Sequence, residues 1–210
     1  MNSSPVYVFA EQRRAVAQAL KIATAKDNER PALRAVNVDH GVALVTNSYV
    51  AVNIPSLVDL PHGAWSADAL EIAVKGAGKD GVRIVQVDAD TLRVDRFAPG
   101  TYGEAAVRDL CGVEVPQQML VGTFFVGRVD LAPNILTLWS QAVEEVSGPE
   151  YRPEVAAFSP DLLSTVFAAR PNAFERHRQA AVKVMTRDLK PAVVLTDDEP
   201  YAIVMPMRVG

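Results

Sequence analysis

The residues that could carry acid–base or metal chemistry are few and lie far apart in the sequence. The three histidines, His40, His62 and His177, fall beside a turn, in a Pro/Gly loop and in a charged run. Each is interpreted as a solvated loop residue, because a metal site or a general base needs further partners at a defined spacing. The acidic run Asp197-Asp198-Glu199 is interpreted as a solvated turn, since no other calcium-ligand spacing accompanies it.

Motifs that bind phosphate or activate a nucleophile are also missing from the sequence. It has neither a glycine-rich phosphate loop, nor a Gly-x-Ser-x-Gly elbow, nor a His/Glu metal motif. An enzyme would need another convergent polar constellation, which the residues do not supply. We therefore predict no catalytic residue, no metal site and no cofactor, and a protein that is not an enzyme.

The composition is typical of a globular protein without a membrane span. The 210 residues are 49% hydrophobic and 22% charged, enough for one large domain or two small ones. No apolar run approaches the ~20 residues of a transmembrane helix, and no signal peptide is seen. The single cysteine, Cys111, excludes an internal disulfide and is interpreted as a small, buried apolar residue. We expect a reducing, cytoplasmic location and no membrane partner.

The basic residues are better organised, because they gather on or near expected helices. The net charge of −4 argues mildly against a nucleic-acid partner, unless the cations share one face. Two explanations stay open: cations favour helix C-termini and loops in any protein, or these cations contact DNA phosphates without reading bases. The candidate DNA contacts are Arg13, Arg14, Lys21, Lys26, Arg30, Lys75, Lys79, Arg176 and Arg178.

Hydrophobic periodicity and turn signals predict helices and short strands along the chain. Helices are expected over residues 11–25 and from Ser66, a favourable N-cap, to about Lys75. Residues 113–116 and 119–126 look extended, and residues 135–146 have the spacing of an amphipathic helix. Further strands are expected over residues 6–9, 33–38, 42–46, 49–54, 82–87 and 91–96.

The second half of the chain partly repeats the first. The segment Trp65 to Leu70 matches Phe158 to Leu163, each with an aromatic residue, a capping serine, an acid in the first turn and a leucine. A similar strand follows each helix, which favours duplication over a chance likeness. Residues 99–153 are too many for a plain linker. We therefore expect a first domain over residues 1–120 and a shortened second domain over residues 121–210.

The C-terminal stretch, Tyr201 to Gly210, combines an apolar, β-type run with the sequence Met205-Pro206-Met207-Arg208. A final core strand is one interpretation of Tyr201 to Val204. Methionines that flank a proline suit a surface that accepts a partner's apolar side chain. Met205 to Arg208 are therefore candidate binding residues.

This ending resembles the C-terminus of the bacterial DNA polymerase III β subunit, the sliding clamp, and residues 189–195 resemble the penultimate strand of that family. Arg30-Pro31-Ala32-Leu33 resembles the family's Arg-Pro-x-Leu motif after the first helix. Leu44 to Ala51 resembles its Leu-x-x-Thr-Asp-Gly-x-Arg-Leu-Ala segment, with Asn47 and Ser48 in place of Asp and Gly. The family's Arg falls at Tyr49 or Val50, depending on register. The turn is expected to survive, because Asn tolerates left-handed backbone geometry.

The resemblance implies a sliding-clamp (DNA clamp) fold, with repeated α+β units whose helices line a ring and whose sheets lie outside. It implies a processivity factor that encircles duplex DNA without sequence preference and binds polymerase and clamp-loader peptides in an apolar pocket. A ring of six units implies a homotrimer of two-unit chains, or another state if the second unit is only half a domain. The alternative is a clamp-fold module that does not encircle DNA and competes for clamp partners. The implied pocket residues are Leu33, Thr46, Ser48, Tyr49, Val50, Ala51, Ile203, Met205, Pro206, Met207 and Arg208.

Overall fold

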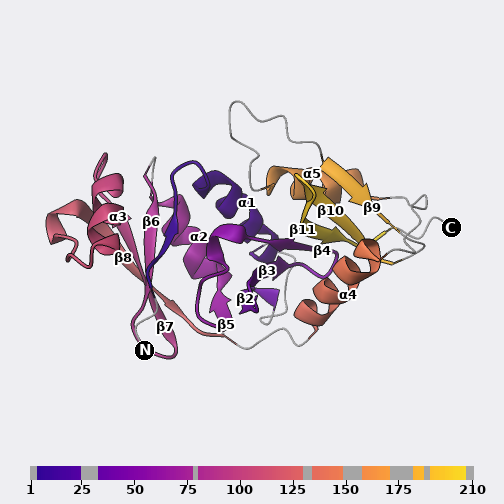
Figure 1. Cartoon of the computed structure of the whole chain (residues 1–210), viewed down its shortest axis with the longest axis horizontal. Helices are drawn as coiled ribbons and strands as arrows, with labels where there is room; N and C mark the ends of the chain where they lie inside the picture. The colour runs from indigo at the N-terminus through magenta and orange to yellow at the C-terminus, as the bar shows by residue number, and fades with distance from the viewer. Residues whose placement is uncertain are drawn as a thin grey trace.

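The computed structural model describes residues 4–24, 33–77, 80–129, 134–148, 158–170, 182–186 and 190–206. They form an elongated molecule in which helices lie on both sides of antiparallel sheets (Figure 1). Within these ranges, no helix has the length and apolar character that a membrane crossing requires.

We call the elements from β1 to β8 the first unit and those from α4 to β11 the second unit. The elements of the first unit are β1 (Val6–Val8), α1 (Arg13–Ala23), β2 (Ala35–Asp39), β3 (Val42–Thr46), β4 (Val50–Asn53), η2 (Pro55–Leu57), β5 (Gly63–Ser66), α2 (Ala67–Lys75), β6 (Val82–Gln86), β7 (Thr91–Phe97), α3 (Tyr102–Leu110), η3 (Gln117–Met119) and β8 (Leu120–Gly127). Those of the second are α4 (Ile135–Ser147), α5 (Pro160–Ala168), β9 (Val182–Met185), β10 (Ala192–Thr196) and β11 (Glu199–Val204). Strand β8 begins at the expected boundary near residue 120 and pairs with β7 of the first unit.

The strands form two antiparallel sheets. Four strands pair in the order β1-β6-β7-β8, and seven pair in the order β5-β2-β3-β4-β11-β10-β9. Both sheets join strands from early and later parts of the first unit. In the four-stranded sheet β1 pairs with β6, and in the seven-stranded sheet β5 pairs with β2. The larger sheet continues from the first unit into the second through the pairing of β4 with β11. We call this pairing the seam.

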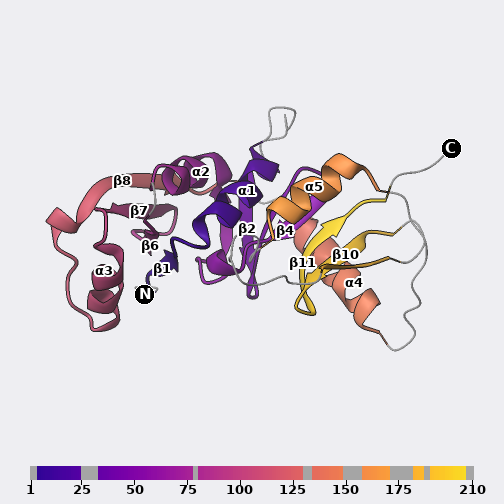
Figure 2. The ribbon, with the colours of Figure 1, turned by 90° about the horizontal axis from the view of Figure 1, so that it is seen from above.

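Three helices cover one side of the sheets. Figure 2 shows α2, α1 and α5 in a row along that side, with α3 and α4 on the opposite side. The row buries Leu20, Leu70 and Val166 in the main core, together with Val52 and Val204 from the two strands of the seam. Full burial of such a side chain contributes about 1.5–3 kcal/mol. The seam is therefore stabilised from this side by the helix row of α2, α1 and α5.

Helix α4 covers the other face of the sheet around the seam. A second core forms where its buried side chains meet four neighbouring strands, β3, β4, β10 and β11. The helix contributes Ile135, Trp139, Ala142 and Val146, and the strands contribute Leu44, Ala51, Val193, Leu195 and Ile203. The amphipathic spacing predicted this helix and the burial of Ile135 and Trp139, but Leu138, which was expected on the same side, is exposed. The buried side of α4 lies across the seam.

Helix α3 lies against the four-stranded sheet and is held there by a chain of charged and polar groups. The buried carboxylate of Asp95 on β7 pairs with Arg83 on β6, at 3.2 Å. Arg83 also pairs with Asp109 on α3, which accepts a hydrogen bond from the Tyr7 hydroxyl. Burial, together with this hydrogen bond, raises the pKa of Tyr7. Buried charges are tolerated when they are paired in this way.

Most expected helices and strands are confirmed, and several details differ from the expectation. Ser66 caps α2 by accepting a hydrogen bond from the Ala69 amide at 3.3 Å, but the Ser159 side chain makes no such bond to α5. Strand β5 and helix α3 were not expected, and residues 113–116 form no strand. Cys111 is exposed rather than buried, because it ends α3 just before Gly112 reverses the chain with a φ of 69°.

Candidate functional site

The seam brings the two expected halves of the peptide pocket side by side. Val50 pairs with Val204 and Ala51 pairs with Ile203 in antiparallel register. The Met205 amide then donates to the Tyr49 carbonyl at 2.8 Å, so the chain around Met205 follows the β3–β4 turn. Segments that are about 150 residues apart in the sequence, at positions 50 and 204, are therefore neighbours in one sheet.

The β3–β4 turn is fixed by its own side chains. The Asn47 side-chain oxygen accepts from the amides of Tyr49 and Val50, at 3.1 and 3.0 Å. The Thr46 hydroxyl donates to the Val50 carbonyl at 2.8 Å and accepts from the Ser48 amide. Ser48 has a φ of 80°, so Ser48 rather than Asn47 adopts the left-handed geometry. The turn survives as expected, but Asn47 contributes through its side-chain hydrogen bonds.

Replacing Ser48 by glycine should therefore stabilise the protein. A side chain in the left-handed region costs about 1–2 kcal/mol, and glycine avoids that cost at a smaller loss of backbone entropy. We expect Ser48→Gly to raise the melting temperature by about 2–4 °C, measured by circular dichroism. The control is Ser140→Gly, because Ser140 is an exposed residue inside α4, where glycine is unfavourable. A fall in melting temperature for both variants would contradict the strain at Ser48.

The expected pocket residues divide into an exposed and a buried group. Tyr49 is 63% exposed and Met205 is 39% exposed, and they share a backbone hydrogen bond at one end of the seam. Ser48 beside them is exposed, and Leu33 and Pro206 are half-buried. Buried within the sheet are Thr46, Val50, Ala51 and Ile203. Met207 and Arg208 lie outside the described residues.

Helix α4 explains why part of the expected pocket is buried. Ala51 and Ile203 point to the face of the sheet that α4 covers, in the same core as Trp139. Val50 points to the opposite face and packs below the helix row. An apolar partner can therefore reach the seam at its Tyr49 and Met205 end, whereas α4 occupies the middle of that sheet face.

Among the expected DNA contacts, the described ones lie on the helix row. Arg14 and Lys21 are exposed on α1, and Lys75 is exposed at the end of α2. Arg13 reaches from α1 to the Lys75 carbonyl at 3.4 Å, and Lys75 also pairs with Glu71. The four cations therefore lie on two neighbouring helices. Lys26, Arg30, Lys79, Arg176 and Arg178 fall outside the described residues.

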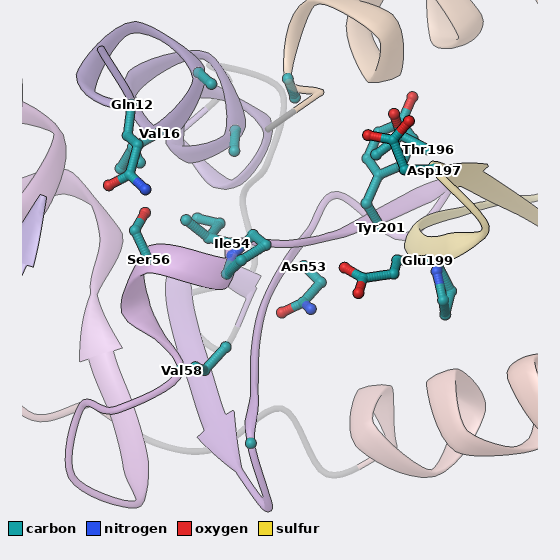
Figure 3. Close-up of a pocket in the computed structure, with 16 residues that line it drawn as sticks. Gln12, Val16, Asn53, Ile54, Ser56, Val58, Thr196, Asp197, Glu199 and Tyr201 are labelled. Atoms are coloured by element: carbon teal, nitrogen blue, oxygen red, sulfur yellow. The ribbon is translucent and has the colours of Figure 1, made fainter. Parts of the chain in front are cut away.

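A cavity of about 550 Å³ lies at the other end of the seam, away from Tyr49 and Met205. Figure 3 shows Gln12, which precedes α1, and Val16 on α1 with Ser56 on one wall. Thr196, Asp197, Glu199 and Tyr201 of the β10–β11 hairpin lie on the other. Its lining includes none of the residues that the sequence marked as a pocket. Sequence patterns did not indicate this cavity, because its walls come from several segments that are far apart in the sequence.

The histidines and the acidic turn of the described residues form no cluster suited to acid–base or metal chemistry. His40 and His62 are exposed and both lie near Asp39, at 3.5 and 3.3 Å. Asp197 and Asp198 form the two-residue turn between β10 and β11, both with positive φ, as a tight hairpin requires. No group of three or more His, Cys, Asp or Glu residues could hold a metal ion there. His177 lies outside the described ranges.

Comparisons with known proteins give a structural likeness only. No protein-family model and no curated protein matches the sequence. The DNA polymerase sliding clamp from Pseudomonas aeruginosa, solved with a ligand, matches all of this chain over 68% of its own, with a TM-score of 0.53 and 14% identity. The sliding clamp from Bacillus subtilis matches 98% of this chain over 64% of its own, with a TM-score of 0.51 and 13% identity. The DNA polymerase III β subunit from Thermotoga maritima matches 98% of this chain over 65% of its own, with a TM-score of 0.52 and 10% identity.

These matches agree with the arrangement of the elements. The chain spans between 64% and 68% of the length of those solved structures. A likeness at such low identity establishes the fold and leaves the function to the site. The chain therefore has the sliding-clamp fold, in a version about two-thirds as long as those clamps.

Proposed function

We propose that this protein is a DNA sliding clamp, a processivity factor that holds a polymerase on duplex DNA. The observation that carries the proposal is the row of α2, α1 and α5, which continues across the seam and exposes cations on α1 and α2. Lysine and arginine on such a face contact phosphates without reading bases, which suits a protein that slides. The net charge of −4 is compatible with this function, because charge on one face decides such contacts.

Partner peptides would bind at the Tyr49 and Met205 end of the seam. Tyr49 offers an exposed ring, and Met205 offers a flexible thioether beside it. Peptides from a polymerase or a clamp loader would insert apolar side chains there. Pro206, Met207 and Arg208 follow directly in the sequence and complete the proposed peptide site.

The peptide site can be tested with two alanine substitutions. The probe is a short, fluorescein-labelled peptide with leucine and phenylalanine anchors, and binding is measured by fluorescence polarisation. Tyr49→Ala combined with Met205→Ala should weaken binding roughly tenfold or more, because a hot-spot residue typically contributes ~2 kcal/mol. Phe125→Ala is the matched control, since Phe125 is equally exposed, at 65%, but lies on β8. Equal affinity in the double variant and the control would reject this site.

The alternative function is a clamp-fold module that competes for clamp partners without encircling DNA. The second unit favours it, because its described elements include one helix, α5, on the side of the helix row, where the first unit has two. Light scattering at micromolar concentration separates the two functions. A homotrimer or another closed oligomer is expected for a clamp that encircles DNA. A stable monomer would favour the competing module, and the peptide site would then serve that function.

A further inference from the structure

Two arginines from different elements bind the C-terminal end of α2 on the helix row. Arg13, the first residue of α1, donates to the Lys75 carbonyl at 3.4 Å, and Arg96 on β7 donates to the Gly76 carbonyl at 2.6 Å. The last carbonyls of a helix lack partners within the helix, so cations are favourable there. The two guanidinium groups are therefore held beside the carbonyls of successive residues.

The packing around Arg96 fixes its guanidinium group. The group lies over the Phe124 ring, with its central carbon 4.5 Å from the ring centre. Two glycines make room for it, because a β-carbon on either Gly76 or Gly122 would collide with its terminal nitrogens. Stacking on an aromatic ring and bonding to a carbonyl both restrict the side chain. Arg96 is half-buried and already ordered, so it loses little freedom when a ligand binds it.

Neither Arg13 nor Arg96 has an acidic partner among the residues that the structure describes, whereas five other arginines do. Those five each form an ion pair with an aspartate or a glutamate: Arg34, Arg83, Arg93, Arg108 and Arg128. The Lys75 ammonium, in the last turn of α2, pairs with Glu71. Three cations and one acid therefore leave a surplus of two positive charges at the end of α2.

Fixed guanidinium groups with unbalanced charge favour an oxyanion as their ligand. Their donors lie in a plane and match the oxygens of a phosphate or a carboxylate in pairs. The position of the two arginines separates these anions, because Arg13 precedes Arg14, which is exposed on the helix row. Duplex DNA would lie on this row, and it carries one phosphate charge per ~1.7 Å of its axis. A phosphate diester is therefore the ligand that the position favours.

We propose that Arg13 and Arg96 form a phosphate clamp, which holds the DNA backbone at the C-terminal end of α2. The inference rests on the proposed function, because it needs duplex DNA on the helix row. It adds a contact from a strand to those expected from the helices, since Arg96 belongs to β7. The carbonyls and the Phe124 ring hold the phosphate clamp in one place, so it fixes where the backbone crosses the row.

The test measures the affinity of the whole chain for a labelled DNA duplex by fluorescence anisotropy at several salt concentrations. Arg96→Gln and Arg13→Gln should each weaken binding at low salt about fivefold and reduce the logarithmic salt slope by roughly one unit, because one phosphate contact is lost. Arg108→Gln is the matched control, since it removes the same charge from α3, on the opposite side of the sheets (Figure 2). Wild-type affinity and slope in both clamp variants, or an equal loss in the control, would overturn the proposal.

A purely structural role for Arg96 gives a different result. Arg96→Gln removes a cation from the end of α2, so a helix cap alone would lower the melting temperature and leave the salt slope of DNA binding at its wild-type value. Arg96→Lys keeps the charge but loses the planar fork, so it should restore the slope and recover the affinity only in part. A lower melting temperature of Arg96→Gln without any change in the salt slope would overturn the phosphate clamp.

The phosphate clamp can fail while the proposed function holds. If the wild type binds the duplex through Arg14 and Lys21, normal binding by the Arg13 and Arg96 variants would overturn the clamp alone. If the wild type does not bind the duplex, the proposed function and the clamp are both wrong.

A labelled decaglutamate peptide tests a carboxylate as the anion. It should bind roughly tenfold or more weakly than the duplex, because its charges are less dense than those of DNA. Binding as tight as that of the duplex, and weakened by Arg96→Gln, would assign the two arginines to an acidic peptide and overturn the choice of DNA.

Discussion

Reversing the charge of Arg14 and Lys21 should abolish most DNA binding. Both residues are exposed on α1, seven positions apart, which places them on the same side of the helix. Changing both to glutamate would remove two of the proposed phosphate contacts and add two repulsive charges. We expect the affinity for a labelled 30-base-pair duplex, measured by fluorescence anisotropy, to fall about 100-fold at low salt. The wild-type affinity should decline steeply with salt, and the variant should lose roughly two units of that logarithmic slope.

A matched control keeps the net charge of the reversed variant but moves the change elsewhere. Lys183 on β9 and Lys190 before β10 are exposed, and they pair with Asp198 and Glu145, respectively. Changing both to glutamate alters the total charge by the same amount, away from the helix row. DNA affinity should then fall far less than in the α1 variant. An equal loss in the two variants would show that net charge, and not the helix row, governs binding.

Removing the Trp139 side chain should cause the largest loss of stability among these substitutions. Trp139 is 5% exposed and packs with Ala51 and Ile203 from the two strands of the seam. Truncating a buried tryptophan to alanine typically costs about 3–5 kcal/mol, because the cavity is filled only in part. We expect Trp139→Ala to lower the free energy of unfolding by that amount, measured by urea denaturation.

Leu138 provides the control on the same helix. It is 41% exposed, so Leu138→Ala should cost less than about 1 kcal/mol. A similarly small cost for Trp139→Ala would mean that α4 is only loosely attached. Partner peptides could then reach Ala51 and Ile203 by displacing the helix. A large cost would confine peptide binding to the exposed end of the seam.

Local patterns in the sequence predicted helices and strands better than they predicted where those elements pack in the fold. The serine cap and apolar spacing of α2 were sufficient to predict it, and the spacing of Ile135 and Trp139 predicted α4. That spacing says which side of α4 is buried but not which sheet covers it. Helix α3 was not predicted, although the ion pair between Glu104 and Arg108 at i,i+4 is typical of a helix. Gly112 is a second helix signal. Its positive φ allows the Schellman motif that ends α3.

The candidate sites were also predicted only in part, because short sequence segments were identified but the cavity between distant segments was not. The resemblance of Thr46 to Ala51 and of Met205 to Arg208 placed both segments in one pocket, and the structure makes them neighbours through Tyr49 and Met205. The acidic turn at Asp197 and Asp198 was predicted correctly from composition. Its role as a wall of a cavity was not predictable, because it depends on the bulge at Tyr201 and on distant residues of α1.

The seam also sets the order in which the protein can fold during synthesis. Strand β4 leaves the ribosome early, whereas its partner β11 is made about 150 residues later. At the ~5–20 residues per second of translation, β4 waits for seconds or more with one edge unpaired. Unpaired strand edges promote aggregation. Nascent chains that stop before β11 should therefore be the ones that engage chaperones, while complete chains close the sheet and escape them.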